Sequence, residues 1–294
     1  MRVRAFAKIN LSLRVLGVRS DGYHELRTVF QSIALHDTLT IRKSAGPFAL
    51  TCNDPRCPTD RRNLVWRAAE AVWKVAGRPA RSRGRGALPG LSIHVSKRIP
   101  MGAGFGGGSS DAVAVIRALG REWRVAEGRQ RAIAAALGAD LPYFFEGGTV
   151  LGLERGDLLF PLVDHPAAWI VLAIPAFGVS TTEAFSWLDA DRAERPRSER
   201  RPRLTVTNDL QGPVSRHHPE IARLVRALEG TGAAPAAMSG SGSGVFGLFG
   251  ERAAAIRAAA ALAALGNRRV SRLTPRVLVT RTVSRRAYER LAGN

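Results

Sequence analysis

The chain has 294 residues, of which 45% are hydrophobic, and its formal net charge at pH 7 is +20. This length is sufficient for one large domain or for two domains with buried cores. The sequence contains no run of eighteen apolar residues, and Lys8 and Asn10 interrupt the N-terminal apolar segment. We therefore expect neither a membrane-spanning helix nor a secretory signal.

The cysteines and the type of basic residue narrow the class of protein further. Cys52 and Cys57 are too few for a disulfide framework or a zinc site, so we expect two reduced thiols and a cytoplasmic protein. Only four of the 44 basic residues are lysine, and the arginines are scattered among many alanines and glycines. This pattern indicates compositional bias, so nucleic-acid binding is the less favoured interpretation of the charge.

Apolar periodicity predicts strands and helices in irregular alternation through the N-terminal half. In chain order we predict a strand over 1–16, a turn over 20–24, strands over 26–35 and 38–43 separated by His36 and Asp37, a helix over 63–75, a loop over 77–90, a strand over 91–95, a glycine-rich loop, a helix that begins at Ser109, a helix over 130–137 and a strand over 149–153.

The C-terminal half shows the same mixture of elements. We predict a strand over 168–174, a helix over 180–188, a charge-rich solvated loop over 189–203, a helix over 219–229, a Gly/Ser loop over 237–244, a strand over 245–249, a helix over 251–265, and a strand over 276–282 followed by a short tail. Irregular alternation of strands and helices favours an α+β fold over a doubly wound parallel sheet.

The stretch from Ile99 to Asp111 carries five glycines and two serines and leads into an apolar helical pattern. Glycine lets the backbone press close to a bound group, and the start of a helix offers amides and a positive dipole end to an anion. No Gly-Lys-Ser/Thr follows, so this is not a Walker-type loop. We interpret it as a phosphate cradle of a small-molecule kinase, with a flexible linker as the alternative.

Two charged residues in apolar surroundings are candidates for the chemistry. Asp140 lies in an apolar segment, where a helix cap is the structural alternative to a catalytic base. Lys8 interrupts an apolar strand, which is costly for a cation unless it is paired, used, or facing solvent at an edge. A lysine beside Asp140 would keep that carboxylate ionised and offset charge on a transferred phosphoryl group.

Three separated motifs resemble those of the GHMP kinase superfamily (galactokinase and the homoserine, mevalonate and phosphomevalonate kinases). They are the Ala-Lys-Ile-Asn-Leu segment over 7–11 with Asp-Gly-Tyr-His-Glu-Leu over 21–26, the glycine loop over 100–110, and Met-Ser-Gly-Ser-Gly-Ser-Gly over 238–244. Within the superfamily, the N-terminal motifs are similar to those of the 4-diphosphocytidyl-2-C-methyl-D-erythritol kinase family. Segments 138–142 and 208–210 match that family too.

This resemblance implies a fold and an activity. It implies a ribosomal-S5-domain-2-like N-terminal domain over 1–157 that binds ATP and a ferredoxin-like α/β sandwich over 158–294 that completes the substrate site. The implied reaction is ATP- and Mg²⁺-dependent phosphorylation of the 2-hydroxyl of 4-diphosphocytidyl-2-C-methyl-D-erythritol, a step of the non-mevalonate route to isoprenoid precursors. We expect a monomer or weak homodimer with no nucleic-acid or membrane partner. Another GHMP kinase of the homoserine or mevalonate type, and then a basic nucleic-acid-binding protein, are the alternatives.

The resemblance also implies site residues. Asp140 corresponds to the catalytic base and Lys8 to its partner. The implied ATP-binding residues are Asn63, Pro100, Met101, Gly102, Ala103, Gly104, Phe105, Gly106, Gly107, Gly108, Ser109 and Ser110. The implied acceptor-binding residues are Asn10, Tyr23, His24, Phe185, Ser239, Gly240 and Ser241. No metal ligand follows from the sequence, although Ser110 is a hydroxyl candidate by analogy. Arg62, Ala103 and Phe105 depart from residues common in the family.

Overall fold

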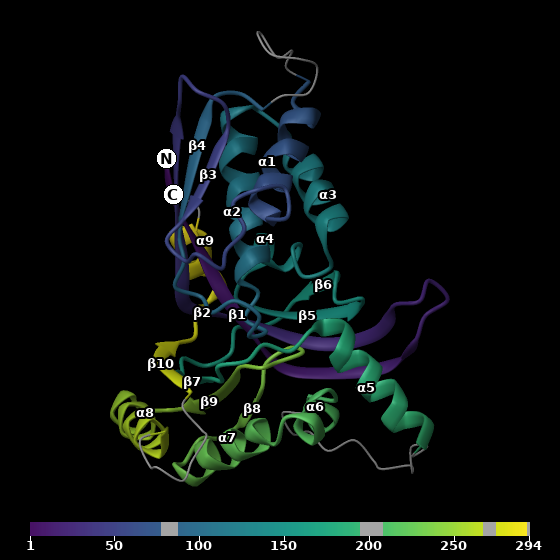
Figure 1. Cartoon of the computed structure of the whole chain (residues 1–294), viewed down its shortest axis with the longest axis vertical. Helices are drawn as coiled ribbons and strands as arrows, with labels where there is room; N and C mark the ends of the chain where they lie inside the picture. The colour runs from purple at the N-terminus through teal and green to yellow at the C-terminus, as the bar shows by residue number, and fades with distance from the viewer. Residues whose placement is uncertain (78–87, 195–207, 267–274, 293–294) are drawn as a thin grey trace.

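Two β-sheets, each covered by helices, form the protein in the computed structural model, which describes residues 1–77, 88–194, 208–266 and 275–292. Figure 1 shows the first sheet and its helices in the upper body and the second sheet with its helices below. Within the described residues, the first sheet has six strands and the second has four. Only β3 and β4 among the described strand pairs are parallel, so the expected α+β class is confirmed.

The upper body contains most of the N-terminal half of the chain. Its strands are β1 (Arg2–Val18), β2 (His24–Lys43), β3 (Ala49–Cys52), β4 (Leu91–Ser96), β5 (Thr149–Glu154) and β6 (Leu158–Pro161). Its helices are α1 (Leu64–Val75), α2 (Gly107–Glu122), α3 (Glu127–Leu137) and α4 (Tyr143–Glu146). The apolar faces of these helices pack on the sheet in one core, to which α1 contributes the buried Val65, Ala68, Ala69 and Val72 at helical spacing.

The lower body follows in the chain. Its strands are β7 (Trp169–Ile174), β8 (Ala236–Met238), β9 (Val245–Phe249) and β10 (Arg276–Arg281), in the sheet order β10-β7-β9-β8. Its helices are α5 (Thr181–Glu194), α6 (Gln211–His217), α7 (Pro219–Gly230) and α8 (Arg252–Gly266). A second core joins these helices to the sheet. In the described part of the chain, no helix is both long and apolar enough to span a membrane.

A third core joins the two bodies. It contains Ile9 of β1 and Ile33 of β2 from the first sheet, and Leu172 of β7 and Phe246 of β9 from the second. All four side chains are fully buried. Burial of this much apolar surface at the junction fixes the two bodies relative to each other, so residues from both can line one site.

The C-terminal segment is a helix rather than a short tail. The helix α9 (Arg285–Ala292) returns to the upper body, where Tyr288 packs against Phe6 with ring centroids 5.7 Å apart (Figure 1). The hydroxyl of Tyr288 donates a hydrogen bond to the carbonyl oxygen of Phe144 at 2.7 Å.

Because β6 also belongs to the first sheet, we propose a domain boundary between 161 and 169 in place of the expected 157/158.

The expected break between two strands at His36 and Asp37 is wrong, because β2 runs through both residues. The strand is continuous because a bulge absorbs the irregularity: Phe6 lies opposite His36, whereas Ala7 lies opposite Ile33. Asp37 is fully buried on this strand, and its carboxylate accepts hydrogen bonds from backbone amides beyond β4. A sequence pattern shows the polar residue but not the partners that make its burial tolerable.

Several predicted boundaries also differ from the structure. Helix α2 begins at Gly107 rather than at Ser109, with Gly106 as its N-cap. Helix α5 continues to Glu194, so 189–194 are helical rather than loop, and the rest of the expected 189–203 loop lies outside the described residues. Elements with too few residues to show a period were not predicted, namely β3, β6, β8, α4 and α6. Residues 237–238, expected to begin the Gly/Ser loop, belong to β8.

Candidate active site

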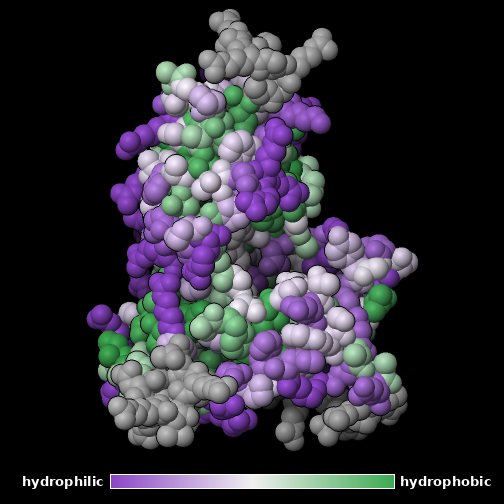
Figure 2. Space-filling view, viewed as in Figure 1, coloured by the Kyte–Doolittle hydropathy of each residue, from purple (hydrophilic) through white to green (hydrophobic). Residues whose placement is uncertain are grey.

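The glycine loop lies between two cavities at the junction of the bodies. Figure 2 shows the molecule hollowed between its upper and lower bodies. One cavity of about 340 Å³ is lined by residues that include Asn63, Lys97 and the loop from Pro100 to Ser109. The other, of about 660 Å³, is lined by Lys8, Asp140 and residues of both bodies. Gly102, Gly104 and Gly106 line both cavities, so the loop forms their common wall.

The loop owes its shape to left-handed glycines. Gly102, Gly104 and Gly106 have φ values of +66°, +75° and +69°, which other residues rarely adopt. A Cβ on Gly106 would lie 2.7 Å from Cζ of Phe144 and 3.1 Å from Cγ of Lys8. Glycine at this position therefore allows the loop to pass directly over Lys8.

Helix α2 turns its N-terminus toward the smaller cavity. The amides of its first turn, including those of Gly107, Gly108 and Ser109, have no carbonyl one turn before them to bond. These groups and the helix dipole favour an anion there. Ser109 lines this cavity, whereas Ser110 is buried and is not among the lining residues. The structure thus brings every expected nucleotide residue except Ser110 to the smaller cavity.

Asn63 combines a place in this cavity with a structural role. It is the N-cap of α1, and its side-chain oxygen accepts a hydrogen bond from the backbone amide of Val65 at 2.9 Å. Its side-chain nitrogen donates to the carbonyl oxygen of Pro58 at 2.6 Å. The nearby Cys57 is a buried free thiol, and burial raises its pKa to about 12, so it is an inert part of the cavity wall.

Three buried ionisable side chains adjoin the smaller cavity, and two of them, Lys97 and Asp111, line it. The ammonium of Lys97 lies 2.5 Å from Asp37 and 2.8 Å from Asp111. Burial lowers the pKa of Lys97, but the two carboxylates outweigh it and hold that pKa above its usual range. Burial, against the attraction of Lys97, raises the pKa of the Asp111 carboxyl to about 8. The second oxygen of Asp111, Oδ1, is buried without a hydrogen-bond partner among the described residues.

Lys8 and Asp140 meet at the base of the larger cavity. Lys8 lies on β1 and is buried, whereas Asp140 lies in the turn between α3 and α4 with 43% of its side chain exposed. Lys8 Nζ is 3.3 Å from Asp140 Oδ2 and donates a hydrogen bond of 2.7 Å to Asn10 Oδ1. The side-chain nitrogen of Asn10 in turn donates a hydrogen bond to Thr28 Oγ1 at 2.7 Å. Both lysine partners are acceptors, so the cation is stabilised and its orientation is fixed.

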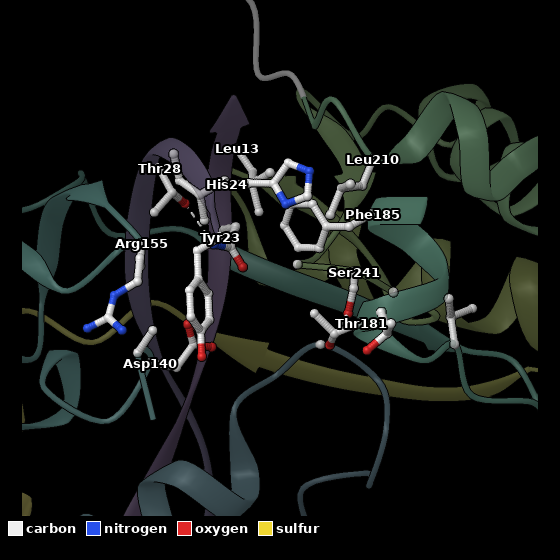
Figure 3. A pocket seen from close by; sticks show the side chains of 18 of the residues that line it. Leu13, Tyr23, His24, Thr28, Asp140, Arg155, Thr181, Phe185, Leu210 and Ser241 are labelled. Atoms are coloured by element: carbon white, nitrogen blue, oxygen red, sulfur yellow. Dashed lines mark hydrogen bonds between the residues drawn. The ribbon is translucent and has the colours of Figure 1, made fainter. Parts of the chain in front are cut away.

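The upper rim of the larger cavity is aromatic (Figure 3). The rings of His24 and Phe185 are stacked, with centroids 4.4 Å apart and an interplanar angle of 26°. Nε2 of His24 lies 3.0 Å from each carboxylate oxygen of Asp189 on α5. Tyr23 stands apart with 55% of its surface exposed, and Arg155 lies over its ring at 5.2 Å. Flat aromatic faces of this kind suit a nucleobase.

The second Gly/Ser loop reaches the larger cavity from the lower body. Gly240 and Ser241 line the cavity, and Ser241 Oγ lies 3.1 Å from Thr181 Oγ1. Ser239 is fully buried beneath them. Its hydroxyl donates a hydrogen bond to the carbonyl oxygen of Gly104 and accepts one from the backbone amide of Asn10. Through Gly104, Ser239 links the second loop to the glycine loop instead of lining the cavity. Of the expected acceptor residues, all except Ser239 line the cavity.

Sequence reasoning missed some residues of both cavities. Asp189 and Thr181 line the larger cavity, and Lys97 and Asp111 line the smaller one. Asp189 lies in a charge-rich stretch that we expected to be a loop. We therefore did not predict its position on α5, where it contacts His24. Lys97 is one of only four lysines in a chain that uses arginine for most of its cations. Among these missed residues, it is the one that the sequence could have marked as a candidate.

Sequence comparisons identify the family. The family descriptions GHMP kinases N terminal domain and GHMP kinases C terminal match residues 63–148 and 197–268. The 4-diphosphocytidyl-2-C-methyl-D-erythritol kinase of Anaeromyxobacter dehalogenans (strain 2CP-C) is 41% identical to the chain over 95% of the chain and 90% of the relative. The chain belongs to the 4-diphosphocytidyl-2-C-methyl-D-erythritol kinase family. A protein of the same name from Moorella thermoacetica (strain ATCC 39073 / JCM 9320) is 36% identical, covering 95% of this kinase and 98% of that relative.

Solved structures agree with this family. A crystal structure of 4-(cytidine 5'-diphospho)-2C-methyl-D-erythritol kinase is 34% identical and superposes with a TM-score of 0.75, covering 96% of this kinase and 99% of that chain. The homoserine kinase of Cytophaga hutchinsonii ATCC 33406 shares the fold at 17% identity and a TM-score of 0.66, covering 96% of this kinase and 95% of that chain. The expected two-domain GHMP kinase fold and kinase activity are confirmed.

Proposed function

We propose that this kinase transfers the γ-phosphoryl group of ATP to the 2-hydroxyl of 4-diphosphocytidyl-2-C-methyl-D-erythritol, in the non-mevalonate route to isoprenoid precursors. The observation that carries the proposal is the glycine loop as common wall of two cavities. A phosphoryl transfer needs donor phosphates and an acceptor hydroxyl held in line on either side of the transferred group. The glycine loop has a cavity on each side, and Asp140 and Lys8 lie in the larger one, so this arrangement meets that requirement.

The smaller cavity is the proposed ATP site. The amides of Gly107, Gly108 and Ser109 would hold the phosphates, as helix N-termini hold anions. Asn63 and Leu64 border the same cavity on the side of α1, where we place the adenine. This arrangement leaves the γ-phosphate end of the nucleotide at the glycines that the two cavities share.

Asp140 and Lys8 are the proposed catalytic pair. Asp140, open to the larger cavity, would take the proton of the acceptor hydroxyl, and Lys8 at 3.3 Å would keep the carboxylate ionised and stabilise charge on the phosphoryl group. Asn10 holds the Lys8 ammonium from the opposite side. Lys8 on β1 and Asp140 in the turn between α3 and α4 both belong to the upper body, so one body supplies the base and the cation.

The rim of the larger cavity is the proposed cytidine site. Tyr23, His24 and Phe185 border a space that a flat base could enter (Figure 3). Gly240 and Ser241, which line the same cavity, would face the polyol and the diphosphate. The excess of basic residues over the whole chain would attract the polyanionic substrates. We propose no nucleic-acid partner.

Mg²⁺ is the expected companion of ATP and would neutralise phosphate charge. Within the ranges that the structure describes, no cluster of three His, Cys, Asp or Glu side chains is placed to hold a metal ion. Mg²⁺ commonly takes most of its ligands from phosphates and water, and this donor set fits that mode. Ser109 is the hydroxyl-bearing residue of the loop that lines the cavity, and we propose it in place of Ser110.

A substrate panel tests the proposed function. Purified protein with ATP and Mg²⁺ receives 4-diphosphocytidyl-2-C-methyl-D-erythritol, homoserine or mevalonate, and ADP release is followed by a coupled assay. We expect turnover with the cytidine compound alone. Turnover with homoserine or mevalonate, and none with the cytidine compound, would replace the proposed acceptor with another small alcohol.

A further inference from the structure

Asp189 contacts His24, a residue of the proposed cytidine site, and lines the larger cavity. It lies on α5 of the lower body, whereas His24 begins β2 of the upper body. Both carboxylate oxygens of Asp189 are 3.0 Å from Nε2 of His24. The His24 side chain is only 14% exposed, and its stacking on Phe185 fixes the plane of the ring.

This contact determines which nitrogen of His24 carries a proton. An ionised carboxylate only accepts hydrogen bonds, so Nε2 must be the donor. In a neutral imidazole the other nitrogen is then an acceptor. The ring of His24 lines the larger cavity, and this other nitrogen, Nδ1, has no hydrogen-bond partner within the described residues.

An acceptor at Nδ1 discriminates between the two pyrimidine bases. Cytosine carries an amino group at position 4, which donates hydrogen bonds, whereas uracil carries a carbonyl oxygen there, which only accepts. An acceptor nitrogen on His24 pairs with the first and repels the second. The opposite tautomer would reverse this preference.

Resting on the proposed function, we propose that Asp189 is a positioning residue that fixes His24 in the Nε2-protonated tautomer and so selects a cytidine over a uridine diphosphate compound. Asp189 reaches His24 across the junction of the bodies, so the preference exists only when α5 is packed against the start of β2. Asp191, two residues further on the same helix, forms an ion pair with Arg216 and provides a matched control.

Binding of CDP and UDP, measured by calorimetry at pH 8, tests the proposal without any turnover. We expect the wild-type protein to prefer CDP, and the ratio of dissociation constants to fall by about five- to tenfold in Asp189→Ala, the effect of one hydrogen bond. Asp191→Ala should keep the wild-type ratio. An unchanged ratio in Asp189→Ala, or an equal loss of CDP and UDP affinity, would overturn the proposal.

Two further readouts separate this role from a structural one. In ¹⁵N NMR spectra of histidine-labelled protein, assigned with His24→Ala, the wild type should show Nε2 protonated and Nδ1 unprotonated, and Asp189→Ala should show a mixture. A proton on Nδ1 in the wild type would contradict the proposal. With the cytidine substrate, Asp189→Ala should raise KM and leave kcat within about twofold, because the cytosine ring is remote from the reacting atoms. Absence of wild-type turnover would refute the proposed function instead.

Discussion

Lys8 illustrates how a single residue connects the fold to the chemistry. A buried ammonium is tolerated only where acceptors replace the water that it loses. The structure provides Asn10 from the same strand and Asp140 from a turn more than a hundred residues later. Since the side chain of Asp140 stays 43% exposed and lines the larger cavity, an incoming hydroxyl could reach the carboxylate.

Substitution of Asp140 by asparagine tests the proposed base. Asp140→Asn keeps the volume of the side chain and removes the proton acceptor, so we expect kcat to fall by about 10²- to 10⁴-fold. Because Asp140 lies outside the smaller cavity, the dissociation constant of ATP should change by less than about threefold. Steady-state kinetics and nucleotide titration check both values, and near-normal turnover in the variant would exclude Asp140 as base.

The Lys97–Asp111 pair predicts a pH dependence of stability. The pKa of Asp111 is about 8 in the folded protein and has its ordinary, lower value in the unfolded chain. Between those pKa values the folded state holds the extra proton, so the free energy of unfolding decreases as pH rises from about 4 to about 8. Asp111→Asn removes this titration and should flatten the decrease by up to about 1.4 kcal/mol per pH unit.

Urea unfolding at several pH values between 5 and 8 measures this difference. The wild type and Asp111→Asn share every other titrating group, so the difference of their slopes isolates Asp111. Parallel slopes for the two proteins would show that the Asp111 carboxyl is not held protonated by burial.

At the scale of elements, the two Gly/Ser loops are joined by the hydroxyl of Ser239 and by a backbone hydrogen bond from Gly244 to Ala103. A Cβ on Gly104 would lie 2.0 Å from the carbonyl oxygen of Ser239, and Gly104 has a φ of +75°. We expect Gly104→Ala to lower the free energy of unfolding by about 2 kcal/mol through strain. It should also lower kcat/KM at least about tenfold, because the loop that separates the cavities must move.

Gly128→Ala is the control for this substitution. Gly128 lies in α3, and a Cβ there would meet nothing within 4 Å. Chemical denaturation and steady-state kinetics of both variants check the expectation, and Gly104→Ala with wild-type stability and kcat/KM would show that the loops do not need this close approach.

The elements also show what could and could not be predicted from sequence. Long periodic segments such as α1 and β1 were predicted, because their apolar spacing is set by the face that they bury. The continuity of β2 was not, because a bulge at 33–36 depends on pairing with β1. The start of α2 at Gly107 was also not predicted, because Gly106 caps it through its left-handed backbone and not through a side chain.

The candidate site divides in the same way. Lys8, Asp140 and the glycine loop were predicted from motifs, and the structure places them around one pair of cavities. The contacts of Asp189 with His24 and of Lys97 with Asp111 were not predicted. Each of them depends on how distant segments pack, and a single sequence does not display that packing.

At the scale of the whole molecule, the shared core between the sheets brings the two cavities together. Ile9 and Ile33 of one sheet and Leu172 and Phe246 of the other form part of this core, and the glycine loop lies at its edge through Ala103 and Phe105. The smaller cavity is therefore lined by the upper body and the larger one by both bodies, on either side of one loop. The central claim is that this arrangement performs one direct phosphoryl transfer.

NMR identification of the product tests this claim most directly. Wild-type protein is incubated with ATP, Mg²⁺ and 4-diphosphocytidyl-2-C-methyl-D-erythritol, and ¹³C and ³¹P spectra are recorded as ADP accumulates. We expect one new phosphate monoester on the 2-hydroxyl carbon for each ADP formed, with the cytidine diphosphate linkage intact. Phosphorylation at a different hydroxyl, or ADP formed without any new phosphate ester, would contradict it.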